Sequence, residues 1–132
     1  MKEIKIGTKM KSECKVDSSM TASAVGSGTA GVYATPMMIA LMENAALKCL
    51  NTFLDDGETS VGISISASHI SATPMDMDVW AIAEITGVDR KRVDFKITAF
   101  DAAGEIGSAE HSRVVVNSEK FEQRANDKLK LV

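Results

Sequence analysis

Apolar and polar residues alternate with a period of two through most of the second half of the chain. This period is typical of strands that bury one face and expose the other. It predicts strands over residues 61–69, 77–85 and 93–99, and a last strand over 105–117. In the first of these strands, one face carries Val61, Ile63, Ile65, Ala67 and His69.

Turn-forming residues separate the predicted strands. They occur at Thr73–Pro74, at Gly87–Arg90 and at Asp101–Gly104. Because short connections join antiparallel neighbours, we predict a single antiparallel sheet. A loosely alternating segment over residues 8–17 predicts an additional, edge-type strand ahead of the others.

Residues 36–54 have a different pattern, with apolar side chains around most of a helical circumference. Such a helix is wrapped by other structure rather than lying on a surface. We predict that Thr35 is its N-cap and that Pro36 fills the first helical position. Asp55–Gly57 suits the end of the helix and a turn.

Two segments contain few apolar side chains that could be buried. Small residues over 18–30 predict a mobile loop before the helix, and the charged tail over 118–130 predicts a short helix that frays. The order is therefore strand, long helix and four strands. A sheet with an apolar face can bury such a helix by curling around it. We predict an α+β fold of about five strands around one long helix, in a single domain over residues 1–132.

Composition narrows the class of protein. The chain is 45% hydrophobic and 25% charged, and its net charge is −3. This acidic balance argues against an electrostatic nucleic-acid binder. Cys14 and Cys49 have no metal-like spacing and indicate a reducing compartment. With no apolar run long enough to span a membrane and no signal peptide at Met1, we expect a cytoplasmic protein.

Glu43 is the first candidate for chemistry, because it interrupts an apolar helical run. Burying an ionised carboxylate is costly unless partners hold it. One interpretation is therefore a catalytic carboxylate. The other is that Glu43 lies at the margin of a solvated stripe formed by Asn44, Lys48 and Asn51.

His69 is the second candidate, since it shares the apolar face of its predicted strand and so points toward the helix. On its own it could equally be a core histidine whose nitrogens bond to backbone. Beside Glu43 and the Thr35 hydroxyl it makes a plausible acid–base group. Thr35 could also be a cap alone, although capping and catalysis are compatible.

The order of elements and the residues around these candidates resemble the hotdog-fold thioesterases. Within them, the chain is most similar to the fluoroacetyl-CoA thioesterase group. The likeness runs over nearly the whole chain. Its most telling segments are Val32–Glu43, Gly62, Ser68–Pro74 and Glu105–Arg113.

In that group a Thr, a Glu and a His form the catalytic triad, and the matching positions here are Thr35, Glu43 and His69. The resemblance implies hydrolysis of a small or medium acyl-CoA to free acid and coenzyme A. It implies that Glu43 attacks the acyl carbonyl or activates the attacking water. His69 would be the general acid–base and Thr35 would position the reacting groups.

The resemblance also implies binding residues. Gly62 matches a substrate-contacting glycine, Arg113 an arginine near the acyl site, and Ile106–Gly107 a backbone stretch that lies along coenzyme A. Taken alone, Gly62 could be a bulge or a gap in a strand, and Arg113 a solvated strand residue. The match gives His111 no catalytic role, so we interpret it as structural.

Hotdog domains usually pair through strands, so the resemblance implies a homodimer with sites at the subunit interface. Coenzyme A is part of the acyl-CoA substrate, and we expect no further cofactor, no metal and no nucleic-acid or membrane partner. The chain has no Gly-rich phosphate loop. Lys91, Arg92 and Lys96 are the candidates for meeting the nucleotide.

Two features depart from the group. The fluoroacetyl-specific enzymes have an aromatic-rich lid before the helix, whereas residues 20–30 here contain no Phe. A different small or medium acyl group is therefore expected. Pro36 also stands where the group usually has Gly, which changes the backbone N–H groups at the helix start.

Two other functions compete with thioester hydrolysis. A hotdog hydratase or dehydratase would use the same pocket, but its usual Asp-x-x-x-x-His pattern is not evident. A non-catalytic acyl-CoA binding or sensing module is the other. Sensors of this fold usually append a DNA-binding segment. A chain of 132 residues with a net charge of −3 is expected to leave no room for one.

Overall fold

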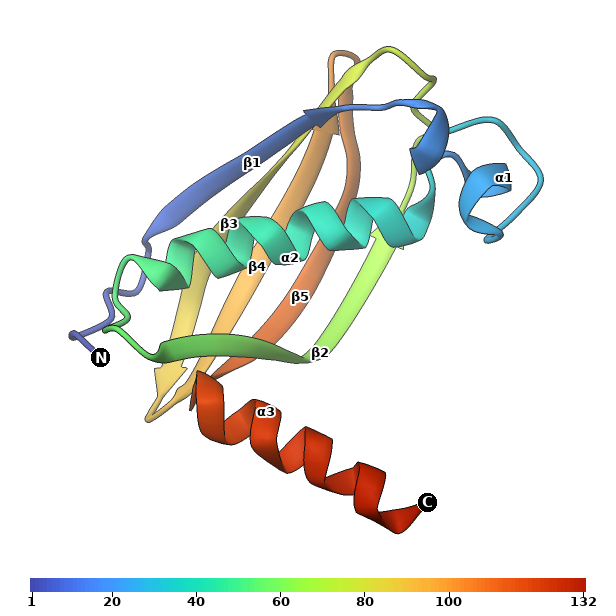
Figure 1. Ribbon diagram of the computed structural model, residues 1–132. Helices are drawn as coiled ribbons and strands as arrows, with labels where there is room; N and C mark the ends of the chain where they lie inside the picture. The colour runs from blue at the N-terminus through green and yellow to red at the C-terminus, as the bar shows by residue number, and fades with distance from the viewer.

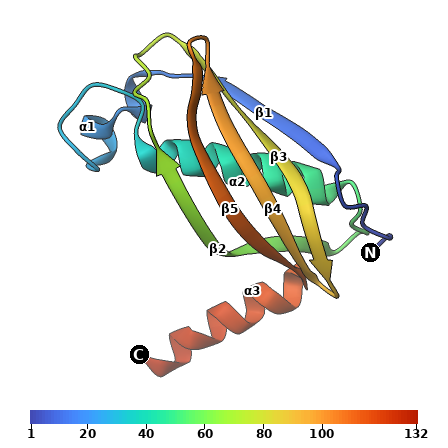
Figure 2. The same ribbon diagram turned by 180° about the vertical axis from the view of Figure 1, so that it is seen from behind.

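The computed structural model describes residues 1–132 and contains one antiparallel sheet (Figure 1). In spatial order its strands are β1 (Lys9–Lys15), β3 (Asp78–Asp89), β4 (Arg92–Asp101), β5 (Gly104–Asn117) and β2 (Glu58–His69). Helix α2 (Thr35–Asn51) lies across one face, and the view from behind shows the opposite face of the sheet (Figure 2). The predicted α+β fold, a five-stranded sheet curled around one long helix, is confirmed.

The core lies between α2 and the sheet face that it covers. The helix contributes Met38, Met42, Ala45, Ala46, Cys49 and Leu50, none of which is solvent-exposed. The two central strands contribute Val79, Ala81, Ala83, Ile85, Val93, Phe95, Ile97 and Ala99. Burying one side chain the size of Met or Leu contributes about 1.5–3 kcal/mol. The alternation predicted for β3 and β4 is confirmed.

The start of α2 differs from the prediction by one residue. Ala34 is the N-cap, Thr35 is the first helical residue and Pro36 the second. The Thr35 hydroxyl makes no capping bond, because His69 engages it instead. The helix also ends earlier than predicted, at Asn51.

The segment over 18–30 is not a loop throughout. It holds a 3-10 turn, η1 (Ser18–Met20), and one helical turn, α1 (Ala22–Val25). Asp17 caps the first and Thr21 caps the second through their side chains. These caps are local signals for a helix start that the abundance of small residues concealed.

The turn between β3 and β4 is tighter than predicted. Strand β3 continues through Gly87 to Asp89, and a register shift marks a β-bulge between Ile85 and Gly87. Arg90, with φ of 59°, makes the turn instead. Positive φ is uncommon for a residue with a side chain but is typical of such tight turns.

Strand β2 contains a bulge that changes which residues face α2. Gly62 pairs with Arg113 and Ser64 pairs with Ser112, so Ile63 is the extra residue. The prediction that Val61 and Ile63 share the face of Ile65 is therefore wrong. An unbulged strand would point Gly62 and His69 to opposite faces. The bulge lets both face the helix.

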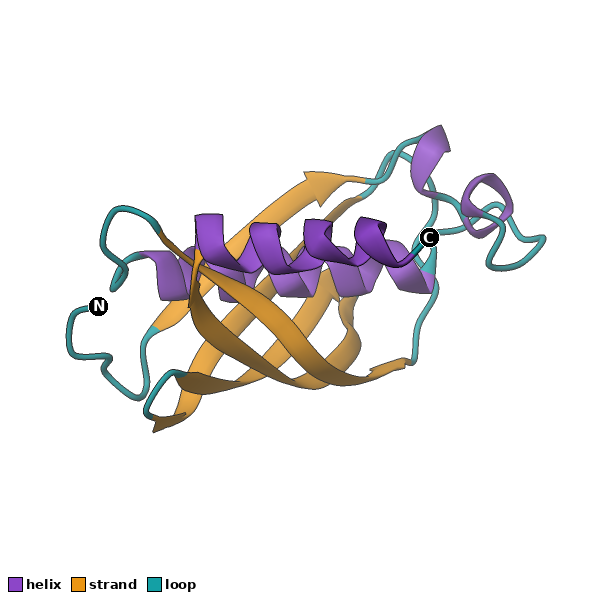
Figure 3. Ribbon diagram, turned by 60° about the horizontal axis from the view of Figure 1, so that its bottom comes forward, coloured by secondary structure: helices purple, strands orange, loops and turns teal.

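The C-terminal segment forms α3 (Ser118–Asp127) followed by a 3-10 turn, η2 (Lys128–Leu131). The predicted short helix is confirmed, and Asn117 caps it. Helix α3 extends away from the sheet beyond β2 (Figure 1), and in Figure 3 it lies nearest the viewer, in front of α2. None of its residues is buried. No helix in the structure has the length and apolar character needed to cross a bilayer.

Candidate active site

The first part of the site forms where the start of α2 meets the end of β2. The Thr35 hydroxyl and Nδ1 of His69 are 2.8 Å apart, which makes a hydrogen bond. The ring of Tyr33 lies edge-on to the imidazole, with centroids 6.4 Å apart. Burial lowers the pKa of His69 below its ordinary value of 6.5. The ring is therefore neutral at pH 7 and able to accept a proton.

Nε2 of His69 is buried and has no hydrogen-bond partner. Buried polar atoms are nearly always paired, so an unpaired one indicates a functional role or a missing partner. Thr35 and His69 line a cavity of about 260 Å³. Its other walls come from the small residues around α1 and from the end of β2: Ala22, Ser27, Val32, Tyr33, Ile70, Ser71 and Ala72.

Glu43 lies further along α2 and faces strand β5. Its Oε2 is 3.6 Å from Nη1 of Arg113, and its side chain is 41% exposed. The solvated stripe also exists and borders Glu43, because Asn44 lines the same cavity as Glu43 and Arg113. There Asn44 accepts a hydrogen bond from Ser12, and Lys48 donates to the carbonyl of Lys11. Glu43 is thus neither buried alone nor simply solvated.

Arg113 is buried and held by a fork of hydrogen bonds. Nε donates to the hydroxyl of Ser60 at 2.8 Å, and Nη2 donates to the Ser60 carbonyl at 2.9 Å. Nη1 lies 3.2 Å from Nε2 of His111. Because a buried charge needs partners, this fork and Glu43 together hold the guanidinium in one place. The arginine is therefore not a solvated strand residue.

Gly62 faces Glu43 across the gap between β2 and α2. A Cβ at this position would lie 2.8 Å from Oε2 of Glu43 and 3.1 Å from Cε1 of His111. Any side chain at Gly62 would therefore displace the carboxylate. The structure brings together Gly62, Glu43 and Arg113, all three of which were predicted site residues.

Ile106 and Gly107 are both buried in the protomer. A Cβ at Gly107 would lie 2.5 Å from the carbonyl oxygen of Ser68 and 2.7 Å from Sδ of Met38. The glycine therefore allows close packing of β5 against β2 and α2. The predicted contact of these two residues with coenzyme A remains a prediction.

The two groups of site residues do not meet within one protomer. Glu43 and Arg113 line a second cavity of about 280 Å³, which shares no residue with the cavity of Thr35 and His69. Along the helix, Thr35 and Glu43 are eight residues apart, which corresponds to about 12 Å. One protomer thus presents an imidazole–hydroxyl pair and a separate carboxylate–guanidinium pair.

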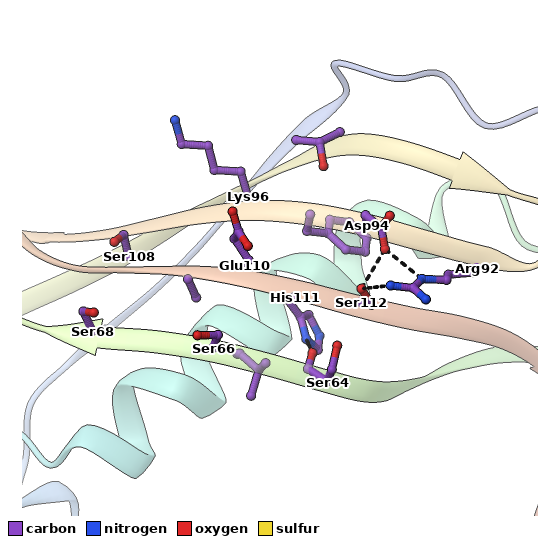
Figure 4. Close-up of a pocket in the computed structure, with 14 residues that line it drawn as sticks. Ser64, Ser66, Ser68, Arg92, Asp94, Lys96, Ser108, Glu110, His111 and Ser112 are labelled. Carbon is purple, nitrogen blue, oxygen red and sulfur yellow. Dashed lines mark hydrogen bonds and ion pairs between the residues drawn. The ribbon is translucent and has the colours of Figure 1, made fainter.

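A wider polar groove lies on the sheet face opposite α2 (Figure 4). Its volume is about 760 Å³, and Arg92, Asp94 and Ser112 form a hydrogen-bonded group in it. Lys96 also lies there, so two of the three basic residues predicted to meet a nucleotide project away from the helix face. They lie across the sheet from Glu43 and His69.

Sequence reasoning missed the roles of Ser60 and His111. Ser60 had no signal beyond its alternation in a strand. His111 had one, because it lies two residues before Arg113 and therefore on the same face of β5. A histidine and an arginine side by side on a buried strand face are unusual enough to indicate a polar network.

Comparisons with known proteins show which family this chain resembles. The family described as fluoroacetyl-CoA-specific thioesterase (FlK) matches residues 16–119. A curated relative, the fluoroacetyl-CoA thioesterase of Streptantibioticus cattleyicolor, is 37% identical over 97 residues, which cover 74% of this chain and 70% of the relative.

Solved structures are similar over almost the whole chain. A variant of the fluoroacetyl-CoA-specific thioesterase FlK superposes with a TM-score of 0.90 at 29% identity, covering 97% of this chain and 99% of that one. The same FlK variant in complex with fluoroacetate and CoA has a TM-score of 0.84 and 31% identity over 89% and 98% of the two chains. A thioesterase superfamily member from Thermus thermophilus has a TM-score of 0.90 at 27% identity over the full length of both chains.

Proposed function

The chain belongs to the fluoroacetyl-CoA-specific thioesterase family, and from that premise we propose that Thr35, Glu43 and His69 hydrolyse a small or medium acyl-CoA. The protein is an acyl-CoA thioesterase, and its products are a free acid and coenzyme A. The observation that carries the residue assignment is the Thr35–His69 hydrogen bond, which leaves Nε2 buried and unpaired. Coenzyme A enters as part of the substrate, and water is the other reactant.

The carboxylate of Glu43 acts on the acyl carbonyl carbon in one of two ways. It attacks the carbon directly, which breaks the C–S bond and forms an anhydride that water then hydrolyses. Alternatively, it removes a proton from a water molecule that attacks the same carbon. In either route the sulfur leaves as a thiolate, and its proton comes from the attacking water. In the anhydride route the neutral imidazole of His69 takes that proton and, as imidazolium, passes it to the thiolate. In the water route His69 passes on the proton that Glu43 removes. The Thr35 hydroxyl orients that ring.

The separation of the two cavities supports a homodimer with shared active sites. Strand β2 is an edge of the sheet, so its outer side is free to pair with β2 of a second copy. A twofold axis near Ile65 and Ser66 would set Gly62 opposite His69 of the partner subunit. Glu43 lies beside Gly62, so its carboxylate would then approach the partner's imidazole.

The surface of α2 around Glu43 fits such a pairing. Pro36, Ala40 and Leu47 share one helical stripe with Glu43, and the first two are exposed. Ile63 on the β2 edge is 51% exposed. An apolar stripe beside an open sheet edge is typical of a surface that another chain covers. The proposed pairing buries this stripe and closes both cavities around the thioester.

The lid region supports an acyl group other than fluoroacetyl. In this chain α1 and its flanking loops present Ala22, Ser27 and Val32 to the cavity of Thr35 and His69. These side chains are small and leave the space that aromatic residues would fill. We propose a small or medium acyl chain whose end lies against this lid.

Release of free thiol from a panel of acyl-CoA thioesters of increasing chain length tests the proposed function. We expect turnover of at least one small or medium acyl-CoA, and a loss of roughly a hundredfold in Glu43→Gln and in His69→Ala. Near-normal turnover in both variants would contradict the assignment. Binding of acyl-CoA without thiol release from any thioester would instead identify a non-catalytic binding module.

A further inference from the structure

His111 is a buried histidine on β5 that the proposed chemistry does not use. It is 2% exposed and lies on the face of the sheet that covers α2, beside the ring of Phe95. Arg113 is the next residue of β5 on that face, and Gly62 of β2 pairs with Arg113. His111 thus lies beside Arg113 of the carboxylate–guanidinium pair, and its hydrogen bonds go to Ser64 and Arg113 rather than to Glu43.

The hydrogen bonds of His111 determine which ring nitrogen carries the proton. Nδ1 lies 2.7 Å from the carbonyl oxygen of Ser64, and a carbonyl only accepts, so Nδ1 donates. Nε2 then holds a lone pair in the neutral ring and accepts from Nη1 of Arg113 at 3.2 Å. Burial lowers the pKa of His111, and the Arg113 charge lowers it further, so the ring is neutral at pH 7.

The carbonyl that His111 holds belongs to the bulge of β2. Ser64 directly follows Ile63, the extra residue, and Figure 4 shows the imidazole on β5 reaching toward Ser64 on the neighbouring strand. The bulge is what turns Gly62 toward Glu43. One side of the ring therefore holds the bulge, and the other side holds the guanidinium that pairs with Glu43.

We infer that His111 is a positioning residue, whose neutral imidazole fixes Arg113 and the β2 bulge and thereby sets the direction of the Glu43 carboxylate. The inference rests on the proposed function, because it assumes that Glu43 acts on the thioester. A displacement of a reacting group by about 1 Å can cost roughly a hundredfold in rate. A residue that never touches substrate can therefore have a large effect on turnover.

Three variants test this role. His111→Leu keeps most of the volume and removes both hydrogen bonds, whereas His111→Gln retains an amide donor and acceptor. Ser112→Ala is the matched control, because Ser112 is the next residue of β5, is also buried, and bonds to Asp94 on the opposite face. Each is measured for kcat, KM and the unfolding midpoint, alone and combined with Arg113→Lys.

We expect His111→Leu to lower kcat roughly tenfold to a hundredfold and His111→Gln to recover part of that loss. Ser112→Ala should lower the unfolding midpoint but keep kcat. In the His111→Leu background, Arg113→Lys should lower kcat little further, because both residues act through the same arrangement. In the Ser112→Ala background, Arg113→Lys should lower kcat as much as it does alone.

Two results would overturn the inference. One is a kcat within about twofold of the unmodified protein in both His111 variants. The other is a full multiplication of the His111→Leu and Arg113→Lys effects, which would mean that the two residues act independently. Glu43→Gln separates this outcome from failure of the proposed function. If Glu43→Gln is inactive while the His111 variants are active, only the inference about His111 fails.

Discussion

The Thr35 hydroxyl illustrates how one residue has a different role from the one that its local sequence predicts. Thr35 precedes a proline and a helix, which is the usual setting of an N-cap. In the structure Ala34 is the cap and Thr35 bonds to His69. The hydroxyl therefore bonds to a second candidate site residue instead of capping α2.

Thr35→Ala should consequently reduce thiol release with little change in stability. Removal of a true N-cap costs about 1 kcal/mol, and no such bond is lost here. We expect turnover to fall at least about tenfold because the imidazole loses its orienting partner. Steady-state kinetics and urea unfolding measure the two effects, and a stability loss without any change in turnover would disprove this role.

Gly62 and Gly107 are predicted to respond differently to alanine. At Gly62 the new methyl group meets the end of the flexible Glu43 side chain, whereas at Gly107 it meets the backbone carbonyl of Ser68. Gly62→Ala should thus reduce turnover and leave stability nearly unchanged. Gly107→Ala should lower the free energy of unfolding by about 1–3 kcal/mol. The reverse pattern in paired kinetic and unfolding measurements would refute this account.

At the scale of elements, sequence periodicity predicted the strands whose faces stay regular. Strands β3 and β4 bury every second residue over Val79–Ile85 and over Val93–Ala99, as their alternation indicated, although β3 contains a bulge near its end. Strand β2 has the same alternation in sequence but not in space. The Ile63 bulge depends on pairing with β5 and on the His111 contact, and neither is encoded by residues near Ile63.

The site was predictable to a similar extent. Glu43 and His69 were candidates from their positions on apolar faces, and the family resemblance added Thr35, Gly62 and Arg113. The sequence could not indicate that Glu43 and His69 line separate cavities. That separation follows from the distance between strand end and helix middle, which only the assembled fold determines.

Deletion of Ile63 tests the role of the bulge in β2. Without the extra residue the strand would pair regularly with β5. Gly62 and His69 would then lie six positions apart and still face the helix, but β2 would lose the local bend beside Gly62. We expect a folded protein whose thiol release falls at least about tenfold, because the loss of the bend moves Gly62 relative to the Glu43 carboxylate. Circular dichroism confirms the fold, and thiol release reports activity. Turnover close to that of the unmodified protein would show that the bulge is dispensable.

At the scale of the whole molecule, the half-buried His69 and the buried His111 link stability to pH. Burial lowers the pKa of both His69 and His111 below 6.5. When the pH falls through 6.5, the unfolded chain binds protons before the folded chain does. Stability is therefore fully present above that pH and decreases as the pH falls below it.

The free energy of unfolding should accordingly decline as the pH falls below 6.5. The carboxyl groups with lowered pKa, such as Asp94 with its ordinary value of 3.8, contribute only at lower pH. His69→Gln should make the decline shallower because one of the two histidines is removed. Urea titrations across this range measure the slope, and an increase in stability on acidification would contradict the direction of both shifts.

The dimer is the assembly that the proposed chemistry requires. One protomer holds a buried imidazole nitrogen without a partner, and elsewhere a carboxylate on an exposed apolar stripe. The open edge of β2 provides a way to join them with an antiparallel pairing. Each dimer would then contain two sites, each built from Glu43 of one subunit and the Thr35–His69 pair of the other.

Subunit complementation tests this arrangement most directly. Differently tagged Glu43→Gln and His69→Ala chains are each measured alone and then co-expressed, so that mixed dimers can be purified. A shared site predicts that a mixed dimer has one intact site and about half the thiol release of the unmodified dimer, although both parent proteins are inactive. Mixed dimers as inactive as their parents would place Glu43 and His69 of one subunit in the same site and contradict the account.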